Sequence, residues 1–139
     1  RIFALGGQLS NLEVDVEDTA SVLMECQCNG KVLPVSLTLD FLHSPPRRTC
    51  TIVGDEGNIV WDYYGKSAVL QSRVTEKTET LDFSNLERNQ LFMDELKHFL
   101  SAVKGEVAPV VDIRSGYESL QMALAALASI ETGEVQILK

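Results

Sequence analysis

Two adjacent residues, Asn29 and Gly30, constrain the fold of this chain more than any other feature. They separate two long stretches, 19–28 and 31–41, that are rich in apolar and β-branched side chains. Asn and Gly tolerate the positive φ angles of a two-residue type I′ turn, so the sequence predicts an antiparallel hairpin. The turn also fixes which residues face one another: Cys28 and Lys31, Cys26 and Leu33, Met24 and Val35, Val22 and Leu37, Ala20 and Leu39.

The two faces of this hairpin differ because successive side chains of a strand point to opposite sides. The face made by the pairs above is almost wholly apolar, which is typical of a surface that faces a core. The other face is mixed. Such a face suits a surface that a partner covers or that lines a cleft, and exposure at a sheet edge explains it equally. Its pairs are Ser21 with Thr38, Leu23 with Ser36, and Glu25 with Pro34.

The rest of the first half also has the pattern of strands joined by tight turns. A proline-rich stretch, 44–48, ends the first hairpin as a loop or bend. Gly54 to Gly57 then predicts the turn of a second hairpin. We therefore expect about six strands in a mainly antiparallel sheet. After the first hairpin, the expected strands are 49–53, 58–63, 68–72 and 75–81.

The second half changes to helical spacing. Apolar residues recur every three or four positions over 86–104, which predicts an amphipathic helix closed by Gly105. Asp112 is the expected N-cap of a second, Ala-rich helix over 113–131 that ends at Gly133. A last strand is expected over 135–138. The sequence thus predicts one α+β domain, 1–139, with two layers: an antiparallel sheet and two helices packed on one of its faces.

Composition and charge exclude several classes of protein. The net charge of −8 gives the chain no general attraction to nucleic acid or to an anionic membrane. No apolar run approaches the roughly 20 residues of a membrane span. The chain begins with Arg1 and runs at once into an apolar stretch, so we expect it to be cut from a longer protein near the start of a strand.

The three cysteines are Cys26, Cys28 and Cys50. An odd number in a chain of this length does not predict a disulfide framework and fits a reducing cytosol. We expect three buried or half-buried free thiols, because cysteine packs as a small apolar side chain. The alternative is a small metal-binding protein in which His43 joins the cysteines, although no zinc-ligand spacing such as C-x2-C is present.

One segment, 40–48, gathers residue types that recognise ligands. Asp40, His43, Arg47 and Arg48 supply a carboxylate, an imidazole and two guanidinium groups at the end of a predicted strand. Arginine binds carboxylate or phosphate with two parallel hydrogen bonds, so we expect these residues to orient a substrate rather than to act as acid or base. The alternative is that the two arginines pair with nearby acids.

Other motifs are weaker or missing. The acidic run Glu13, Asp15, Glu17 and Asp18 has the oxygen ligands of a hard cation, but we expect a solvated loop there. No G-x-G-x-x-G opens a helix after a strand, and no P-loop, G-x-S-x-G or H-E-x-x-H occurs. The sequence therefore contains no dinucleotide or hydrolase fingerprint of its own.

A longer pattern in the second half points to a known family. It consists of Asn89, a helix with Phe and Leu, Gly105-x-x-x-Pro109, Asp112 and an Ala-rich helix that ends near Gly133. In this pattern the chain resembles the C-terminal domain of the Gfo/Idh/MocA oxidoreductases, which include glucose-fructose oxidoreductase and inositol dehydrogenase. Weaker matches at 17–20, 29–30 and 52–59 extend the resemblance over essentially the whole chain.

The resemblance implies an NAD(P)-dependent dehydrogenase that acts on a sugar, polyol or sugar derivative, and the cysteine usage described above predicts that it is cytoplasmic. Its Rossmann domain, Glu-Lys-Pro segment and Asp-x-x-x-His element lie upstream of the part matched here, and Asp40 and His43 have different spacing. The implied partners are that Rossmann domain in the same polypeptide, a small-molecule substrate and further copies of the chain through the sheet face. This chain alone is expected to be inactive, because hydride chemistry belongs to the cofactor.

A rival hypothesis keeps the fold but changes the function. In it, the chain is a stand-alone binding or scaffolding module that associates through its open sheet face, since fold alone does not determine function.

Overall fold

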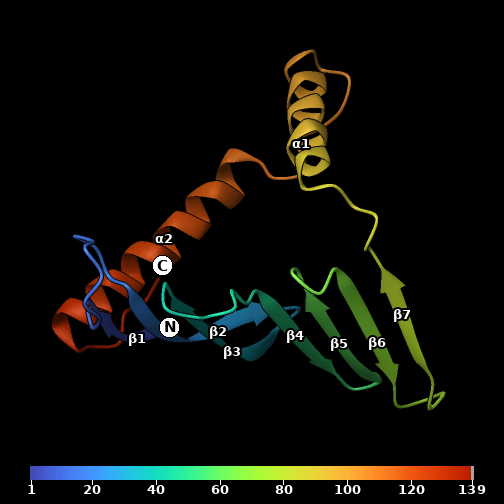
Figure 1. The fold of residues 1–139 in the computed structure, drawn as a ribbon. Coiled ribbons are helices and arrows are strands. Elements are labelled where there is room, and N and C mark those ends of the chain that lie inside the picture. The colour runs from blue at the N-terminus through green and yellow to red at the C-terminus, as the bar shows by residue number, and fades with distance from the viewer. Residues whose placement is uncertain (139) are drawn as a thin grey trace. The chain divides into compact units, whose positions relative to one another are not determined.

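The computed structural model of the chain describes residues 1–138. The chain divides into two compact units, Arg1–Leu42 with Val110–Lys139, and His43–Pro109. Figure 1 shows the elements of both units. Within residues 1–138, seven strands form two antiparallel sheets, of three and of four strands, and two α-helices complete the α+β fold. The fold class is therefore confirmed, with seven strands in place of about six and with two sheets.

The first unit is built on the predicted hairpin. Strands β2 (Thr19–Cys28) and β3 (Lys31–Asp40) pair in the register expected from the turn, from Cys28 opposite Lys31 to Thr19 opposite Asp40. Asn29 and Gly30 both have positive φ angles, 49° and 76°, as the type I′ turn requires. Strand β1 (Ile2–Gly7) pairs with the other side of β2, which gives the order β1-β2-β3.

Helix α2 (Ile113–Thr132) covers part of the apolar face of this sheet. Its N-cap is Asp112, as predicted, and the Asp112 carboxylate accepts a hydrogen bond from the backbone N–H of Ser115 at 2.9 Å. This hydrogen bond holds the pKa of Asp112 below its ordinary value. The buried core joins the helix to two strands and contains Ile2, Ala4, Val22 and Ala125. Figure 1 shows the C-terminal part of α2 beside β1.

The strand expected over 135–138 is not formed. Only Gln136 pairs with β1, through a single antiparallel bridge to Ile2 with both backbone hydrogen bonds at 2.8 Å. The β-branched residues of this segment made it a plausible strand. Its contact with β1 is limited to one residue because the serine hydroxyl of Ser129, rather than a strand backbone, satisfies the next outward-facing N–H of β1, at Ala4.

The second unit contains β4 (Thr49–Gly54), β5 (Gly57–Asp62), β6 (Ser67–Ser72) and β7 (Thr78–Asp82), paired in sequence order. Each neighbouring pair is antiparallel. The predicted turn at Gly54 and Gly57 joins β4 to β5, and these two glycines face one another in the ladder. A meander of this kind places the ends of alternate strands at one edge, where the loops can form a site.

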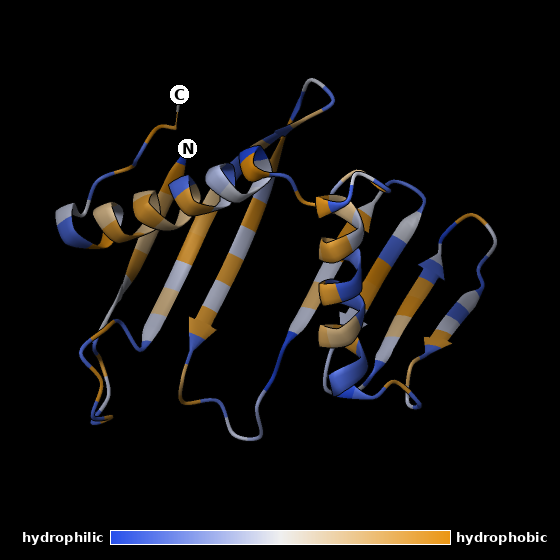
Figure 2. Cartoon of the chain, turned by 90° about the horizontal axis from the view of Figure 1, so that it is seen from above, coloured by the Kyte–Doolittle hydropathy of each residue, from blue (hydrophilic) through white to orange (hydrophobic). Residues whose placement is uncertain are grey.

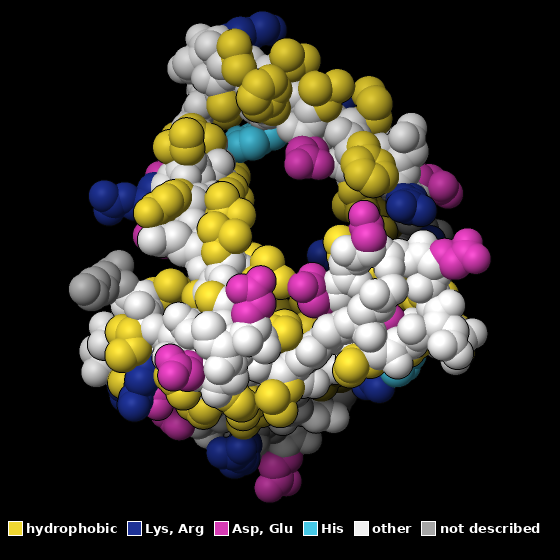
Figure 3. Space-filling view, turned by 90° about the vertical axis from the view of Figure 1, so that its left-hand side faces the viewer, with side chains coloured by type: hydrophobic (Ala, Val, Ile, Leu, Met, Phe, Trp, Pro, Cys, Tyr) yellow, Lys and Arg dark blue, Asp and Glu magenta, His cyan; other side chains and the backbone are white. Residues whose placement is uncertain are grey.

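Helix α1 (Arg88–Val103) follows β7 in the second unit. Its apolar residues form the predicted stripe, which Figure 2 shows as orange bands. No side chain of α1 is buried, and Phe99 is 61% exposed. Figure 3 shows hydrophobic side chains in yellow over this helix at the top of the view. Neither helix in the described residues is long and apolar enough to span a membrane.

Candidate functional site

The four residues predicted to contact a substrate are divided between the two compact units. Asp40 is the last residue of β3 in the first unit, and its carboxylate accepts a hydrogen bond from the backbone N–H of Leu42 at 2.9 Å. His43, Arg47 and Arg48 belong to the loop that begins the second unit. Of the four, Arg48 lines a pocket within its own unit.

Arg48 is held against two aromatic rings of β5 and the turn that follows it. Its guanidinium carbon lies 5.4 Å from the ring centre of Tyr63 and 5.8 Å from that of Trp61. The register of the β4–β5 hairpin explains this contact. Thr49 pairs with Asp62, so residue 48 lies opposite residue 63, and the Arg48 carbonyl accepts from the Tyr63 N–H at 2.9 Å. Such cation–π contacts restrict the arginine while leaving its N–H groups available.

The pocket beside Arg48 has a volume of about 670 Å³, which is in the range of small-molecule sites. We call it the aromatic pocket, because its walls include Trp61, Tyr63, Tyr64 and Phe83. The rings of Trp61 and Tyr63 meet edge to face at 6.1 Å, and those of Tyr63 and Tyr64 at 5.2 Å. These edge contacts fix the rings relative to one another.

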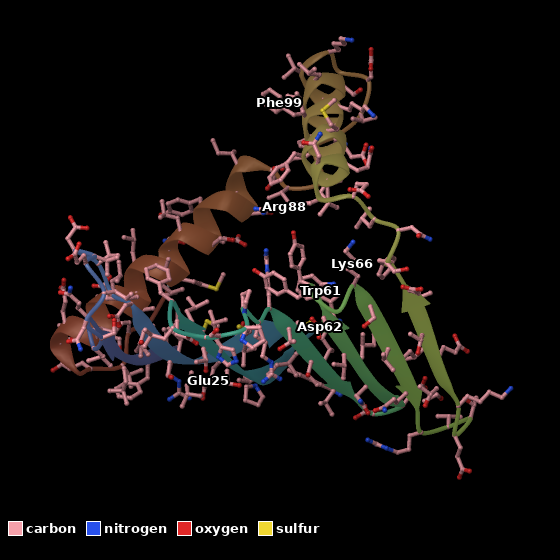
Figure 4. The ribbon with its side chains drawn as sticks, in the orientation of Figure 1. Glu25, Trp61, Asp62, Lys66, Arg88 and Phe99 are labelled. Carbon is pink, nitrogen blue, oxygen red and sulfur yellow. The ribbon has the colours of Figure 1, made fainter. Side chains whose placement is uncertain are left out.

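Two further cations line the aromatic pocket. Lys66 lies in the turn before β6, and its ammonium group donates to the backbone carbonyls of Ser84 and Leu86 at 3.0 and 3.1 Å. These bonds tie the turn to the segment that leads into α1. Arg88 begins α1 and lies 5.9 Å from the ring centre of Phe92. Figure 4 shows Trp61 and Lys66 at the same end of their sheet and Arg88 at the start of α1.

Two carboxylates, Asp62 and Glu87, also line the aromatic pocket. Asp62 accepts a hydrogen bond from the Gly65 N–H at 2.9 Å, so one of its oxygens stabilises the turn after β5. Glu87 is the N-cap of α1 but makes no side-chain capping bond. Three cations face two carboxylates here, in a chain whose net charge is −8. Arginine does not exchange protons at neutral pH, so this arrangement is built for binding rather than for proton transfer.

Sequence analysis did not identify the aromatic pocket, although one signal for it was present. The turn of the β4–β5 hairpin was predicted, and in the register that the structure shows, one further pair sets Arg48 opposite Tyr63. The contributions of Lys66 and Arg88 depend on a turn and on the path of the chain after β7, which no local pattern specifies.

The first unit has a second hollow, on the mixed face of the hairpin. It has a volume of about 540 Å³, and its lining includes Leu23, Glu25, Pro34 and Ser36. Arg1 lies at its rim and forms a two-bond ion pair with Glu25, at 2.6 and 3.0 Å. The hollow fits the expectation that this face lines a cleft or receives a partner.

The acidic run before β2 does not behave as a uniformly solvated loop. Glu13, Asp15 and Glu17 are exposed, as expected, but Asp18 is only 1% exposed. Its carboxylate accepts hydrogen bonds from the Ser10 hydroxyl at 2.6 Å, the Leu9 N–H at 3.0 Å and the Ser10 N–H at 2.9 Å. These bonds, led by that of the hydroxyl, lower the pKa of Asp18 from 3.8 to about 2. Asp18 therefore organises the preceding loop as a charged acceptor.

The cysteines are less buried than expected. Cys26 is half-buried, whereas Cys28 and Cys50 are exposed, and all three are free thiols. Cys28 lies at the end of the hairpin, and Cys50 lies on β4, whose residues are all exposed. Within residues 1–138, no three side chains of the metal-binding types come together.

The two antiparallel sheets and two helices of the described residues define an α+β domain. This domain contains a pocket of small-molecule size. The family model described as "Oxidoreductase family, C-terminal alpha/beta domain" matches residues 4–137. The chain therefore belongs to the Gfo/Idh/MocA oxidoreductase family and is a C-terminal domain of that family, as its sequence pattern indicated.

Solved structures share the fold of this chain. Two crystal forms of the UDP-N-acetylglucosamine 3-dehydrogenase GnnA from Acidithiobacillus ferrooxidans match 94% of the chain, with TM-scores of 0.75 and 0.71. The sequence identities are 23% and 21%, so the likeness concerns the fold. The chain spans 40% of the length of those proteins. No curated protein sequence gave a match.

Proposed function

We propose that this chain is the C-terminal domain of an NAD(P)-dependent dehydrogenase that acts on a sugar, polyol or sugar derivative. The observation that carries the proposal is the family match over residues 4–137, which spans both compact units. For the same reason we propose that the two units act as one domain. The fold shared with a dehydrogenase of a sugar nucleotide supports the choice of substrate class.

The nicotinamide cofactor does not fit the residues of this chain. Both sheets are antiparallel, and neither helix in the described residues follows a strand through a glycine-rich turn that would hold a pyrophosphate. We propose that NAD or NADP binds a Rossmann domain of the same cytoplasmic polypeptide. The cofactor supplies the hydride chemistry there, and this chain alone transfers no hydride.

The proposed contribution of this chain is to hold the substrate and to assemble the enzyme. Asp40, His43, Arg47 and Arg48 are proposed as substrate-orienting residues. The mixed face of β1–β3 is proposed to pair with the same face of another copy, because it leaves Leu23 61% exposed beside a hollow. Leu5, 63% exposed, lies on the same face, and a contiguous exposed apolar patch is typical of a surface that associates.

The test is to read the gene upstream of Arg1 and to assay the whole protein. We expect a Rossmann segment with a G-x-G-x-x-G turn and a Glu-Lys-Pro segment. The purified protein should then reduce NAD or NADP with at least one member of a panel of polyols, sugars and sugar nucleotides that includes UDP-N-acetylglucosamine. A frame that opens at residue 1, or a whole protein that binds neither nicotinamide cofactor, contradicts the proposal and favours the stand-alone binding module.

A further inference from the structure

The cationic side chains of the aromatic pocket are held by aromatic rings and backbone carbonyl groups rather than by carboxylates. In the part of the chain that the structure describes, neither Arg48 nor Arg88 forms an ion pair. Each guanidinium instead lies over an aromatic ring. We propose that the aromatic pocket binds an anionic sugar, meaning a sugar ring that carries a phosphate or a carboxylate group.

The anionic group is assigned to the two arginines. Arg48 packs against Trp61 and Tyr63, which reduces the conformational entropy that it loses on binding. A guanidinium held in this way keeps its fork of N–H donors, which match the oxygen spacing of phosphate and carboxylate. Lys66 contributes charge but not the main contact, because two backbone carbonyls already accept from its ammonium group.

The ring of the ligand is assigned to the aromatic wall. Tyr64 is 55% exposed and stands nearly perpendicular to Tyr63, at 88°. A perpendicular contact with Tyr63 covers at most one face of the Tyr64 ring, so at least one face is not covered by Tyr63. The C–H face of a sugar ring is apolar enough to pack on an aromatic ring, and a pocket with apolar walls and few polar groups suits such a ligand.

The carboxylates of Asp62 and Glu87 select a ligand with hydroxyl groups. A carboxylate repels an anion but accepts hydrogen bonds from hydroxyls. Glu87 makes no side-chain capping bond, so its oxygens remain acceptors at the pocket. A ligand with one anionic group and several hydroxyls can accept hydrogen bonds from the arginines and donate hydrogen bonds to the carboxylates. An inorganic anion without hydroxyl donors can bind only to the arginines.

The choice of a sugar rests on the proposed function, but the need for an anion rests on the aromatic pocket itself. The binding test therefore uses the chain of residues 1–139 without cofactor, so that it is independent of hydride transfer. Trp61 is the single tryptophan of the chain and lines the pocket, so its fluorescence reports on occupancy there. The probes are glucose 6-phosphate, glucuronate, glucose and inorganic phosphate.

We expect saturable changes in Trp61 fluorescence with glucose 6-phosphate or glucuronate, and binding at least tenfold weaker for glucose and for inorganic phosphate. A preference between the two charged sugars identifies phosphate or carboxylate as the anionic group. Equal binding of glucose overturns the role of the arginines, and equal binding of inorganic phosphate overturns the role of the ring. The absence of any saturable change overturns the proposal.

Variants separate the two contacts. Arg48→Gln should weaken binding of the charged sugar about tenfold or more, because a charge-assisted hydrogen bond is lost. Arg114→Gln removes the same charge from α2 in the other unit and should leave binding unchanged. Tyr64→Ala should weaken binding whereas Tyr64→Phe should retain it. Unchanged binding in Arg48→Gln contradicts the site, whether or not the whole enzyme proves to be a dehydrogenase.

Discussion

The hydroxyl of Ser129 on α2 accepts a hydrogen bond from the backbone N–H of Ala4 on β1, at 2.9 Å. The same hydroxyl donates to the backbone carbonyl of Glu134 at 2.7 Å. Ser129 is fully buried, at 0% exposure. One side chain therefore satisfies an outward-facing N–H at the edge of the sheet and joins β1 to the segment after α2. Buried backbone groups require such partners.

Ser129→Ala should lower the free energy of unfolding by about 1–3 kcal/mol, because it leaves the buried N–H of Ala4 without its partner and removes the hydrogen bond to the Glu134 carbonyl. Urea unfolding followed by circular dichroism measures the change. Ser119→Ala is the matched control, since Ser119 lies on the same helix and its hydroxyl bonds to the Ser115 carbonyl at an exposed position. Equal effects of the two substitutions would contradict the structural role of Ser129.

The pKa of Asp18 gives the stability a specific pH dependence. The folded pKa is about 2 and the ordinary value is 3.8, so the unfolded chain binds more protons between these values. The stabilisation is complete above the ordinary pKa and is lost as the pH falls through about 4 to about 2. Asp18→Asn should be less stable than the wild type at neutral pH, and the difference should narrow over this window.

Urea unfolding of both proteins at a series of pH values measures this difference. Asp15→Asn removes a charge from the same loop without removing a buried hydrogen-bond acceptor, so it serves as the control. A constant gap between wild type and Asp18→Asn from neutral pH to pH 2 would show that the charge of Asp18 is not what stabilises the loop.

The features that could be predicted from the sequence are those that depend on interactions between residues close together in the chain. The register from Cys28 and Lys31 onward followed from Asn29 and Gly30, because a two-residue turn permits only one pairing. The burial of Asp18 did not follow, because all four residues of the acidic run have similar side chains. What distinguishes Asp18 is contact with the N–H groups of Leu9 and Ser10, which the loop brings to it.

The same distinction applies to the candidate site. The contact of Arg48 with Trp61 and Tyr63 is a consequence of the register of the β4–β5 hairpin, of which the sequence predicts the turn. The approach of Arg88 depends on the course of the chain between β7 and α1. Asp40 is close to Arg48 in sequence but belongs to the other compact unit, so the register of the β4–β5 hairpin does not relate the two residues.

Gly6 is required for the close approach of β1 and β2. A Cβ atom at Gly6 would lie 2.4 Å from the Thr19 carbonyl oxygen and 2.9 Å from the Ala20 Cα. Gly6→Ala should therefore destabilise the chain by about 1–3 kcal/mol through overpacking. Gly116→Ala on α2 should instead stabilise the chain by up to about 1 kcal/mol, because alanine has a higher helix propensity than glycine. A Cβ atom at this position would meet no other atom within 4 Å. Thermal unfolding of both variants tests the contrast, and equal shifts would contradict it.

Association through the mixed face predicts that the isolated chain forms dimers or larger species at high concentration. Leu23 lies on that face, and its removal from an apolar contact should cost about 1.5–3 kcal/mol. Leu23→Lys should therefore weaken association about tenfold or more in sedimentation experiments. Leu37→Lys introduces the same charge on the opposite face of the hairpin, at a partly exposed position of β3, and should leave association intact. A monomeric wild type, or dissociation caused only by Leu37→Lys, would exclude the mixed face as the contact.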